Sequence, residues 1–98
     1  MYRGTTPTNE FTVDLDLTGA EVIYITYSQQ GKVVVEKDTN DITVTAKKLT
    51  VKLTQEETLR FSEWSVDIQI RARFPNGDAV ASQVIRTTAN DVLKDGVI

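Results

Sequence analysis

The 98-residue sequence contains no cysteine and no histidine, and only one tryptophan and two prolines. Histidine is the commonest general base, and without it the Ser–His–Asp and Cys–His forms of nucleophilic catalysis are excluded. Histidine and cysteine also supply most zinc ligands. We therefore expect a non-enzymatic protein with no catalytic residues, no metal and no cofactor.

Long apolar runs are missing as well. No stretch approaches the ~20 apolar residues that a membrane-spanning helix needs, and the opening MYRGTTP lacks the apolar region of a secretory signal. The lack of cysteine favours a reducing compartment. The sequence thus predicts a protein made in the cytoplasm without membrane contact, which is compatible with later assembly into an exported particle.

Basic charge is scarce, since 11 lysines and arginines stand against 14 aspartates and glutamates, for a net charge of −3. Nucleic-acid binding depends on clustered positive charge that neutralises phosphates, so we expect no nucleic-acid partner. The content of 40% hydrophobic and 26% charged residues is ordinary for a folded protein. The length suits a single domain over residues 1–98.

The clearest structural signal is a hairpin within residues 66–86. Apolar and polar residues alternate over residues 66–74, as expected for a strand with one buried face. The turn-forming P-N-G of residues 75–77 follows, and residues 79–86 form the returning strand.

The turn type sets the register of this hairpin. A type I turn followed by a left-handed Gly77 spares Pro75 from donating a ladder hydrogen bond. It places Ile68 opposite Val84, so that Val80 and Val84 point into the core. The side chains predicted to point away from the core are those of Ala79, Ala81 and Ile85.

Five other segments show strand patterns: residues 11–17, 22–27, 32–37, 42–46 and 49–53. Every position of residues 22–27 is apolar or β-prone, so we expect a central strand covered on both faces. Pairing like residues across the two hairpin turns places Tyr27 opposite Val33, and Val44 opposite Val51.

One short helix interrupts the strands. Thr54 and Glu57 match a capping box, in which each side chain satisfies the other residue's backbone N–H. The helix is predicted over residues 55–61, with Leu59 and Phe61 docking onto an open end of the sheets. About seven strands, with this helix between the fifth and sixth, predict an all-β, two-sheet antiparallel sandwich of immunoglobulin-like character, with a barrel as the alternative.

Carboxylates are the remaining candidates for acid–base chemistry. Asp14 and Asp16 share the polar face of the first predicted strand, and Glu56 and Glu57 lie in the first helical turn. Each pair has a structural explanation, since exposed strand faces are solvated and acidic residues stabilise helix N-termini. We interpret both pairs as structural.

Trp64 has two interpretations. It covers one end of the sandwich, as a single tryptophan often does, or it forms an exposed platform with Tyr2, Tyr24 and Tyr27 on which a sugar ring stacks. The second interpretation makes the chain a carbohydrate- or receptor-binding module, with Trp64 as the ligand-stacking residue.

Several short motifs in a fixed order extend over nearly the whole chain. They are RGTTPT at residues 3–8, LTQEET at 53–58, QIR at 69–71, the A-x-A-S of 79–82 and the closing DVLKDGVI. In this order and spacing the sequence resembles the small, largely uncharacterised proteins encoded in prophages of Gram-positive bacteria, often near virion structural genes. The opening Arg-Gly followed by an alternating strand also resembles, more weakly, the N-terminal domains of some phage baseplate proteins.

This resemblance implies a structural or accessory phage protein, present in the bacterial cytoplasm when expressed and in the virion after assembly. The expected partners are other phage structural proteins or further copies of the chain in a homo-oligomer. The polar N-terminal arm (residues 1–9) and the C-terminal segment (residues 88–98) are the expected docking elements. The C-terminal segment ends in apolar residues, which require a surface to cover them. The candidate docking residues are Arg3, Thr5, Pro7, Val92, Leu93, Val97 and Ile98.

Overall fold

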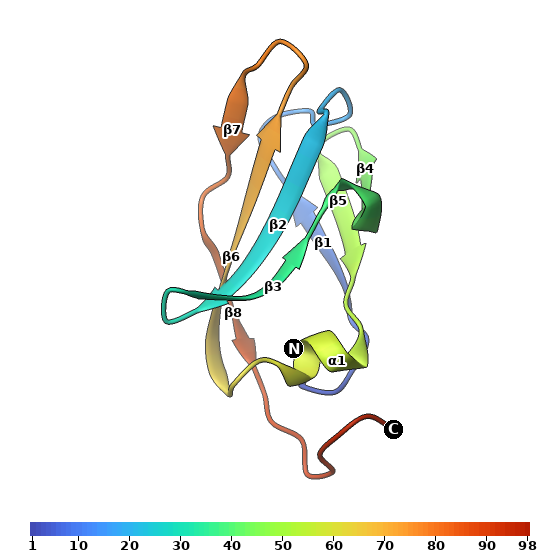
Figure 1. The fold of residues 1–98 in the computed structure, drawn as a ribbon, viewed down its shortest axis with the longest axis vertical. Coiled ribbons are helices and arrows are strands. Elements are labelled where there is room, and N and C mark those ends of the chain that lie inside the picture. The colour runs from blue at the N-terminus through green and yellow to red at the C-terminus, as the bar shows by residue number, and fades with distance from the viewer.

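In the computed structural model, residues 1–98 form eight strands, one short α-helix and one 3-10 helix (Figure 1). The strands are β1 (Thr8–Thr12), β2 (Val22–Gln29), β3 (Lys32–Lys37), β4 (Ile42–Thr45), β5 (Lys48–Lys52), β6 (Trp64–Arg73), β7 (Ala79–Ala81) and β8 (Ile85–Ala89). The helices are η1 (Thr39–Asp41) and α1 (Gln55–Leu59). Neither helix is long and apolar enough to cross a membrane.

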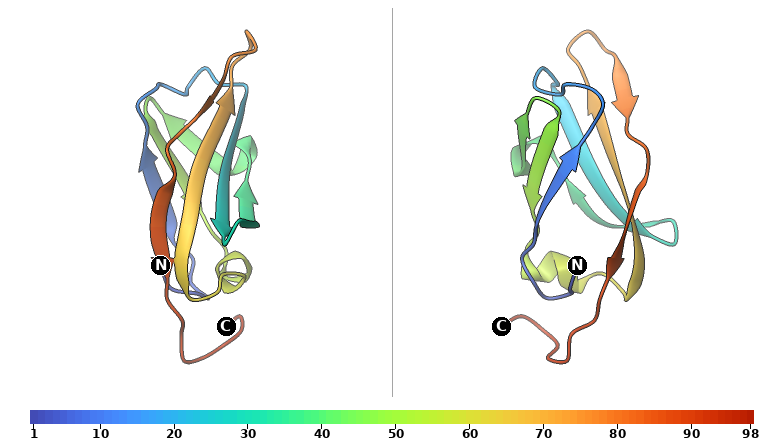
Figure 2. Two further views of the ribbon diagram at one scale, coloured as in Figure 1. Left: turned by 90° about the vertical axis from the view of Figure 1, so that its left-hand side faces the viewer. Right: turned by 180° about the vertical axis from the view of Figure 1, so that it is seen from behind.

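The strands form two antiparallel sheets that face each other in a molecule 47 Å long, as Figure 2 shows from two further sides. The smaller sheet has the order β1-β5-β4. The larger has the order β3-β2-β6, and both β7 and β8 pair with β6. This is the strand order of an immunoglobulin variable-type sandwich (B-E-D and C′-C-F-G) without its first strand and its C″ strand. The predicted immunoglobulin-like sandwich, with its helix between the fifth and sixth strands, is confirmed.

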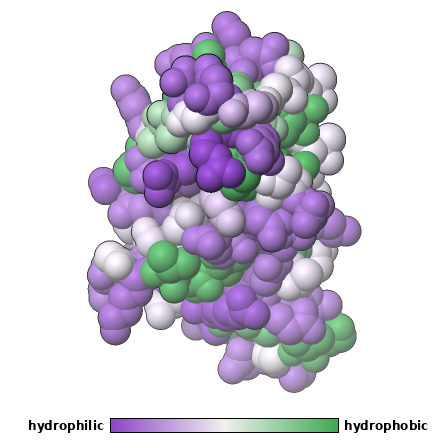
Figure 3. All heavy atoms as spheres, turned by 45° about the horizontal axis from the view of Figure 1, so that its top comes forward, coloured by the Kyte–Doolittle hydropathy of each residue, from purple (hydrophilic) through white to green (hydrophobic).

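One hydrophobic core of 15 buried residues fills the space between the sheets. β2 lies in the centre of its sheet, as predicted, and contributes Ile23, Ile25 and Tyr27 to this core. Tyr24, between them, is 42% exposed. The expectation that residues 22–27 are covered on both faces is wrong, because the second sheet covers only one side of the first. On the face seen in Figure 3, hydrophobic residues form small separate groups within a largely hydrophilic surface.

The first strand begins and ends earlier than the predicted residues 11–17. β1 pairs with β5 and ends at Thr12. Beyond it, the Asp16 carboxylate accepts hydrogen bonds from the backbone N–H (2.9 Å) and the hydroxyl (2.6 Å) of Thr18. Local bonding of this kind competes with a strand ladder, so the chain bends away and leaves Leu15 46% exposed.

The β2–β3 hairpin does not have the predicted register. Its loop is the pair Gln30 and Gly31, whose φ angles of 52° and 77° are the two positive angles of a type I′ turn. This turn shifts the pairing by one residue, and a β-bulge one step further along the ladder adds a second, so Tyr27 lies opposite Val35 instead of Val33.

The β4–β5 hairpin departs from its prediction in the same way. Ala46 takes the left-handed position of the turn, with φ of 53°, and Val44 lies opposite Leu49 instead of Val51. In both hairpins the pairing slips by two residues. Because side chains alternate with a period of two, such a slip keeps the predicted faces of β4 and β5. In β3 the bulge breaks the alternation, and Val33 is 61% exposed although it was expected to pair with Tyr27.

β7 follows the predicted register against β6. Val80 lies opposite Ala72 and is half-buried, whereas its neighbours Ala79 and Ala81 are exposed, as predicted. The regular backbone pairing with β6 ends at Ser82. There the Ile70 N–H donates to the Ser82 side-chain Oγ (3.0 Å) and not to the Ser82 carbonyl.

β8 is shifted by one residue relative to β7. Ile68 lies opposite Ile85 instead of Val84. Ile85 therefore packs against the core and Val84 is 54% exposed, so the predicted directions of these two side chains are wrong. The shift brings Asp67 opposite Arg86, and the two form an ion pair with an N–O distance of 2.8 Å. A one-residue irregularity thus reverses which side chain faces inward.

Candidate functional site

Both chain ends and α1 meet at one end of the sandwich, at the bottom of Figure 1. We call this region the terminal pole, and it consists of residues 1–7, 54–61 and 90–98. The first residues run parallel to the end of β8. The Arg3 N–H donates to the Asn90 carbonyl (2.9 Å), and the Asn90 N–H donates to the Met1 carbonyl (2.8 Å). The predicted N-terminal arm is therefore held against the domain, and its last residues belong to β1.

α1 begins with the predicted capping box. Thr54 Oγ1 accepts a hydrogen bond from the Glu57 N–H (3.1 Å), and Glu57 Oε1 accepts one from the Thr54 N–H (2.9 Å). The helix ends at Leu59, earlier than predicted. Phe61 is nevertheless buried, with its ring centroid 5.9 Å from that of Tyr27, so it docks onto the sheets as expected.

Arg3 links α1 to the C-terminal segment. Its guanidinium donates to the carbonyls of Leu59 (3.0 Å) and Phe61 and to the Asp91 carboxylate (2.6 Å). Carbonyls at the end of a helix lack helical partners and attract positive charge. The hydrogen bond from Arg3, followed by one from the Val92 N–H, lowers the pKa of Asp91 from its usual value. One side chain thus connects three parts of the pole.

The rest of the N-terminal arm packs against the same end of the sandwich. Gly4 has φ of 74°, a left-handed angle that glycine adopts without strain, and it lies against the side chain of the leucine that ends α1. The Thr5 carbonyl accepts a hydrogen bond from Thr58 Oγ1 (2.8 Å). The Pro7 carbonyl accepts one from the Leu53 N–H (3.0 Å). The predicted docking residues of the arm are therefore engaged within the chain.

The C-terminal segment is anchored by its backbone and exposes its apolar side chains. Gln55 Nε2 donates to the Ile98 carbonyl (3.2 Å), and the Ile98 N–H donates to Gln55 Oε1 (2.9 Å). Ile98 is nevertheless 86% exposed and Val97 55% exposed, and Leu93 is fully exposed. Val92, by contrast, is half-buried. Three of the predicted docking residues thus remain free at the surface of the pole.

A buried ion pair that the sequence patterns did not reveal lies beside α1. Lys37 Nζ is 2.7 Å from Glu57 Oε1, and the two side chains are only 10% and 15% exposed. Burial alone would raise the pKa of Glu57, but the hydrogen bonds from Lys37 and Thr54 outweigh it and lower the pKa. The only sequence signal for the pair is that Lys37 shares a strand face with the buried Val35.

Tyr27 is fully buried within β2, and its hydroxyl accepts a hydrogen bond from Asn9 Nδ2 (2.7 Å). Burial, only partly offset by that hydrogen bond, raises the pKa of Tyr27 to about 12. Tyr27 therefore cannot belong to the exposed aromatic platform considered for Trp64.

Trp64 begins β6 and is 72% exposed, so it does not cover the end of the sandwich. Its φ of 94° is an angle that residues other than glycine rarely adopt. The indole borders a surface hollow of about 510 Å³, which we call the Trp64 hollow. The polar side chains that line it include those of Gln29, Lys32, Arg60, Glu63, Asp67 and Arg86. Tyr2 and Tyr24, although exposed, do not line it.

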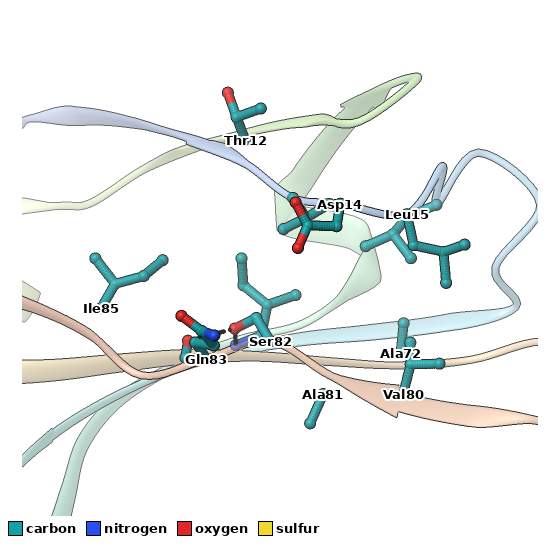
Figure 4. A pocket seen from close by; sticks show the side chains of 12 residues that line it. Thr12, Asp14, Leu15, Ala72, Val80, Ala81, Ser82, Gln83 and Ile85 are labelled. Carbon is teal, nitrogen blue, oxygen red and sulfur yellow. Dashed lines mark hydrogen bonds between the residues drawn. The ribbon is translucent and has the colours of Figure 1, made fainter.

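A mostly apolar cleft of about 360 Å³ opens between residues 12–17 and the edge formed by β6, β7 and β8 (Figure 4). Asp14 is the single charged residue in its lining, and Asp16 lies outside it. The two hydrogen bonds from Thr18 lower the pKa of Asp16, which is the opposite of what a general acid needs. The structure thus does not unite the two carboxylates in one site, and no group of three or more acidic side chains is placed to hold a metal ion.

Comparison with known proteins yields one likeness in fold. No protein-family model matches the chain, and no curated protein matches it. Among solved structures, the chain is similar to the V domain of amphioxus IgVJ-C2, with 13% identity and a TM-score of 0.40 over 94% of this chain and 97% of that one.

Proposed function

We propose that this chain is a non-enzymatic structural or accessory protein of a phage or prophage particle, which acts through protein–protein contacts in several copies. The observation that carries the proposal is the arrangement of the terminal pole. Leu93, Val97 and Ile98 are exposed there, while Gln55 holds the backbone of the last residue. Apolar side chains on a backbone that is already held lose little further freedom on association, and their burial favours it.

The prophage assignment is supported by where the resembling segments lie. Residues 3–8, 53–58 and 91–98 are far apart in the sequence, yet hydrogen bonds connect all three at the terminal pole. The segments that carry most of the resemblance therefore form one surface. In this proposal Arg3, Thr5 and Pro7 position the pole and do not contact the partner.

The partner is another structural protein of the particle or a further copy of this chain. The protein is made in the bacterial cytoplasm and then incorporated into the virion. Mass spectrometry of purified particles tests this step directly. We expect the chain in stoichiometric amounts, and its absence from intact particles would exclude a virion role.

The contact surface is tested by co-purification of the chain with the products of neighbouring genes, followed by light scattering of the complexes. The double substitution Leu93→Asp and Ile98→Asp is expected to abolish assembly, because it places charge on side chains that are free in the isolated chain. Val84→Asp is the matched control, since Val84 is also an exposed apolar residue but lies outside the terminal pole. Equal assembly by both variants would contradict the proposed surface.

A further inference from the structure

We propose that the Trp64 hollow is a binding site for a saccharide that carries an acidic group. This site shares only Arg60 with the terminal pole, and the proposal does not depend on a role in a particle. Its first support is the indole itself. Trp64 is 72% exposed, and its backbone adopts an angle that glycine would adopt without strain. The fold thus holds a large apolar ring in water at a local conformational cost.

Hydrogen bonds from the neighbouring strand hold the backbone on either side of Trp64. Gln29 of β2 donates through Nε2 to the carbonyls of Ser62 (2.7 Å) and Ser65 (3.3 Å). Its Oε1 accepts from the Ser62 N–H (2.9 Å). One side chain therefore ties down the chain on both sides of the indole. A ligand that stacks on Trp64 meets a platform that is already in place, which reduces the entropy cost of binding.

Free polar groups surround the ring. The side chains of Lys32, Arg60 and Glu63 line the hollow, and none of them takes part in the ion pairs of the structure. Sugars combine an apolar C–H face, which stacks on an aromatic ring, with hydroxyl groups that need donors and acceptors. The hollow, of about 510 Å³, offers an exposed indole for stacking and free side chains that donate or accept hydrogen bonds.

The local charge favours an acidic ligand. Asp67 and Arg86 neutralise each other in an ion pair of 2.8 Å, which leaves the two cations Lys32 and Arg60 with the single anion Glu63. The hollow is therefore positive within a chain whose net charge is −3. A protein surface is a poorer fit, because only two of the 11 lining residues are hydrophobic, whereas the buried centres of protein interfaces are apolar.

The test uses the isolated chain and an array of immobilised oligosaccharides, in which neutral glycans are paired with counterparts that carry a carboxylate or phosphate. Because Trp64 is the only tryptophan, its fluorescence reports on this hollow alone. The best acidic glycan of the array is then titrated in solution against its neutral counterpart. We expect a saturable change in emission, with the acidic glycan bound about tenfold more tightly, as one charge-assisted contact would give.

Four variants separate the contributions. Trp64→Ala should abolish binding and Trp64→Phe should keep part of it, with the fold of each verified by circular dichroism. The double substitution Lys32→Gln and Arg60→Gln should remove the preference for the acidic glycan. Lys52→Gln, a change of an exposed lysine outside the hollow, should leave binding unaltered.

Three outcomes would overturn the proposal. One is an array signal that is equal for the wild-type chain and Trp64→Ala. Another is a preference for neutral glycans. The third is an emission change produced only by a neighbouring-gene protein, which would identify the hollow as a protein contact.

Discussion

Replacing Trp64 by glycine and by alanine separates the cost of its backbone angle from the contribution of its side chain. Glycine in a strand is usually less stable than alanine by about 0.5–1 kcal/mol, because it loses more backbone freedom on folding. At position 64, however, φ is 94°. Such an angle adds about 1–3 kcal/mol of strain for a residue with a Cβ. We therefore expect the order to reverse, with Trp64→Gly more stable than Trp64→Ala by about 1 kcal/mol.

The effect of removing the side chain follows from its exposure. Since Trp64 is 72% exposed, only about a quarter of an indole surface of ~200 Å² is withdrawn from water, which corresponds to about 1 kcal/mol. Truncation of a buried tryptophan costs about 3–5 kcal/mol. Trp64→Ala should therefore lower the free energy of unfolding by about 1 kcal/mol, and Trp64→Gly should leave it close to the wild-type value.

Urea unfolding followed by far-UV circular dichroism is the suitable assay, because both variants lack the only tryptophan. Ser65 provides the control, since it is the next residue of β6, is exposed and has no positive φ. There, Ser65→Gly should be less stable than Ser65→Ala by about 0.5–1 kcal/mol. If glycine is the less stable residue at both positions, the angle at Trp64 is not strained, and the argument that the fold displays this ring at a cost fails.

Three further predictions concern the terminal pole and the core beside it. Between pH 10 and about 12 the unfolded chain loses the Tyr27 proton before the folded chain does. Urea titrations should therefore show the wild type losing about 3 kcal/mol relative to Tyr27→Phe over this range, and an equal loss by both would contradict the raised pKa. Because the folded state lowers the pKa of Glu57, stability should fall as the pH drops below 4.5, and Glu57→Gln should flatten this acid limb in the same titrations. That variant should also lose about 3 kcal/mol at neutral pH, since it leaves Lys37 buried without its partner; an unchanged midpoint would contradict the role of the pair. Arg3→Ala should cost about 2 kcal/mol and speed amide hydrogen exchange in the C-terminal segment, and unchanged exchange there would show that Arg3 does not hold that segment.

The hairpin registers show where sequence reasoning stops. Alternation of apolar and polar residues correctly assigned the inward faces of β4 and β5, because a period of two survives a slip of two. It could not choose between registers that differ by two residues. The turn at Ala46 makes that choice for β4 and β5, and the turn at Gln30 and Gly31 together with the β-bulge makes it for β2 and β3. The sequence signals a positive φ clearly only at the glycine.

The candidate sites were accessible to sequence reasoning in the same partial way. Trp64 and the apolar C-terminal residues stood out by type and position. The contacts that organise these sites did not stand out. Arg3 and Asp91, which form a hydrogen bond, are 88 residues apart in the sequence, and Gln29 and Ser62 are 33 residues apart. No local sequence pattern predicts such pairs.

By itself, then, the sequence determined the strands, the capped helix and the sandwich, because these follow from side-chain period and from bonds between residues that are close in the chain. Only the tertiary structure decided that Val84 faces outward and Ile85 inward, because a single irregularity at Ser82 reverses the alternation in β8. It also decided that the N-terminal arm is held and that Trp64 is exposed. Both depend on which distant backbone groups find a partner, and that is settled only when the whole chain has packed.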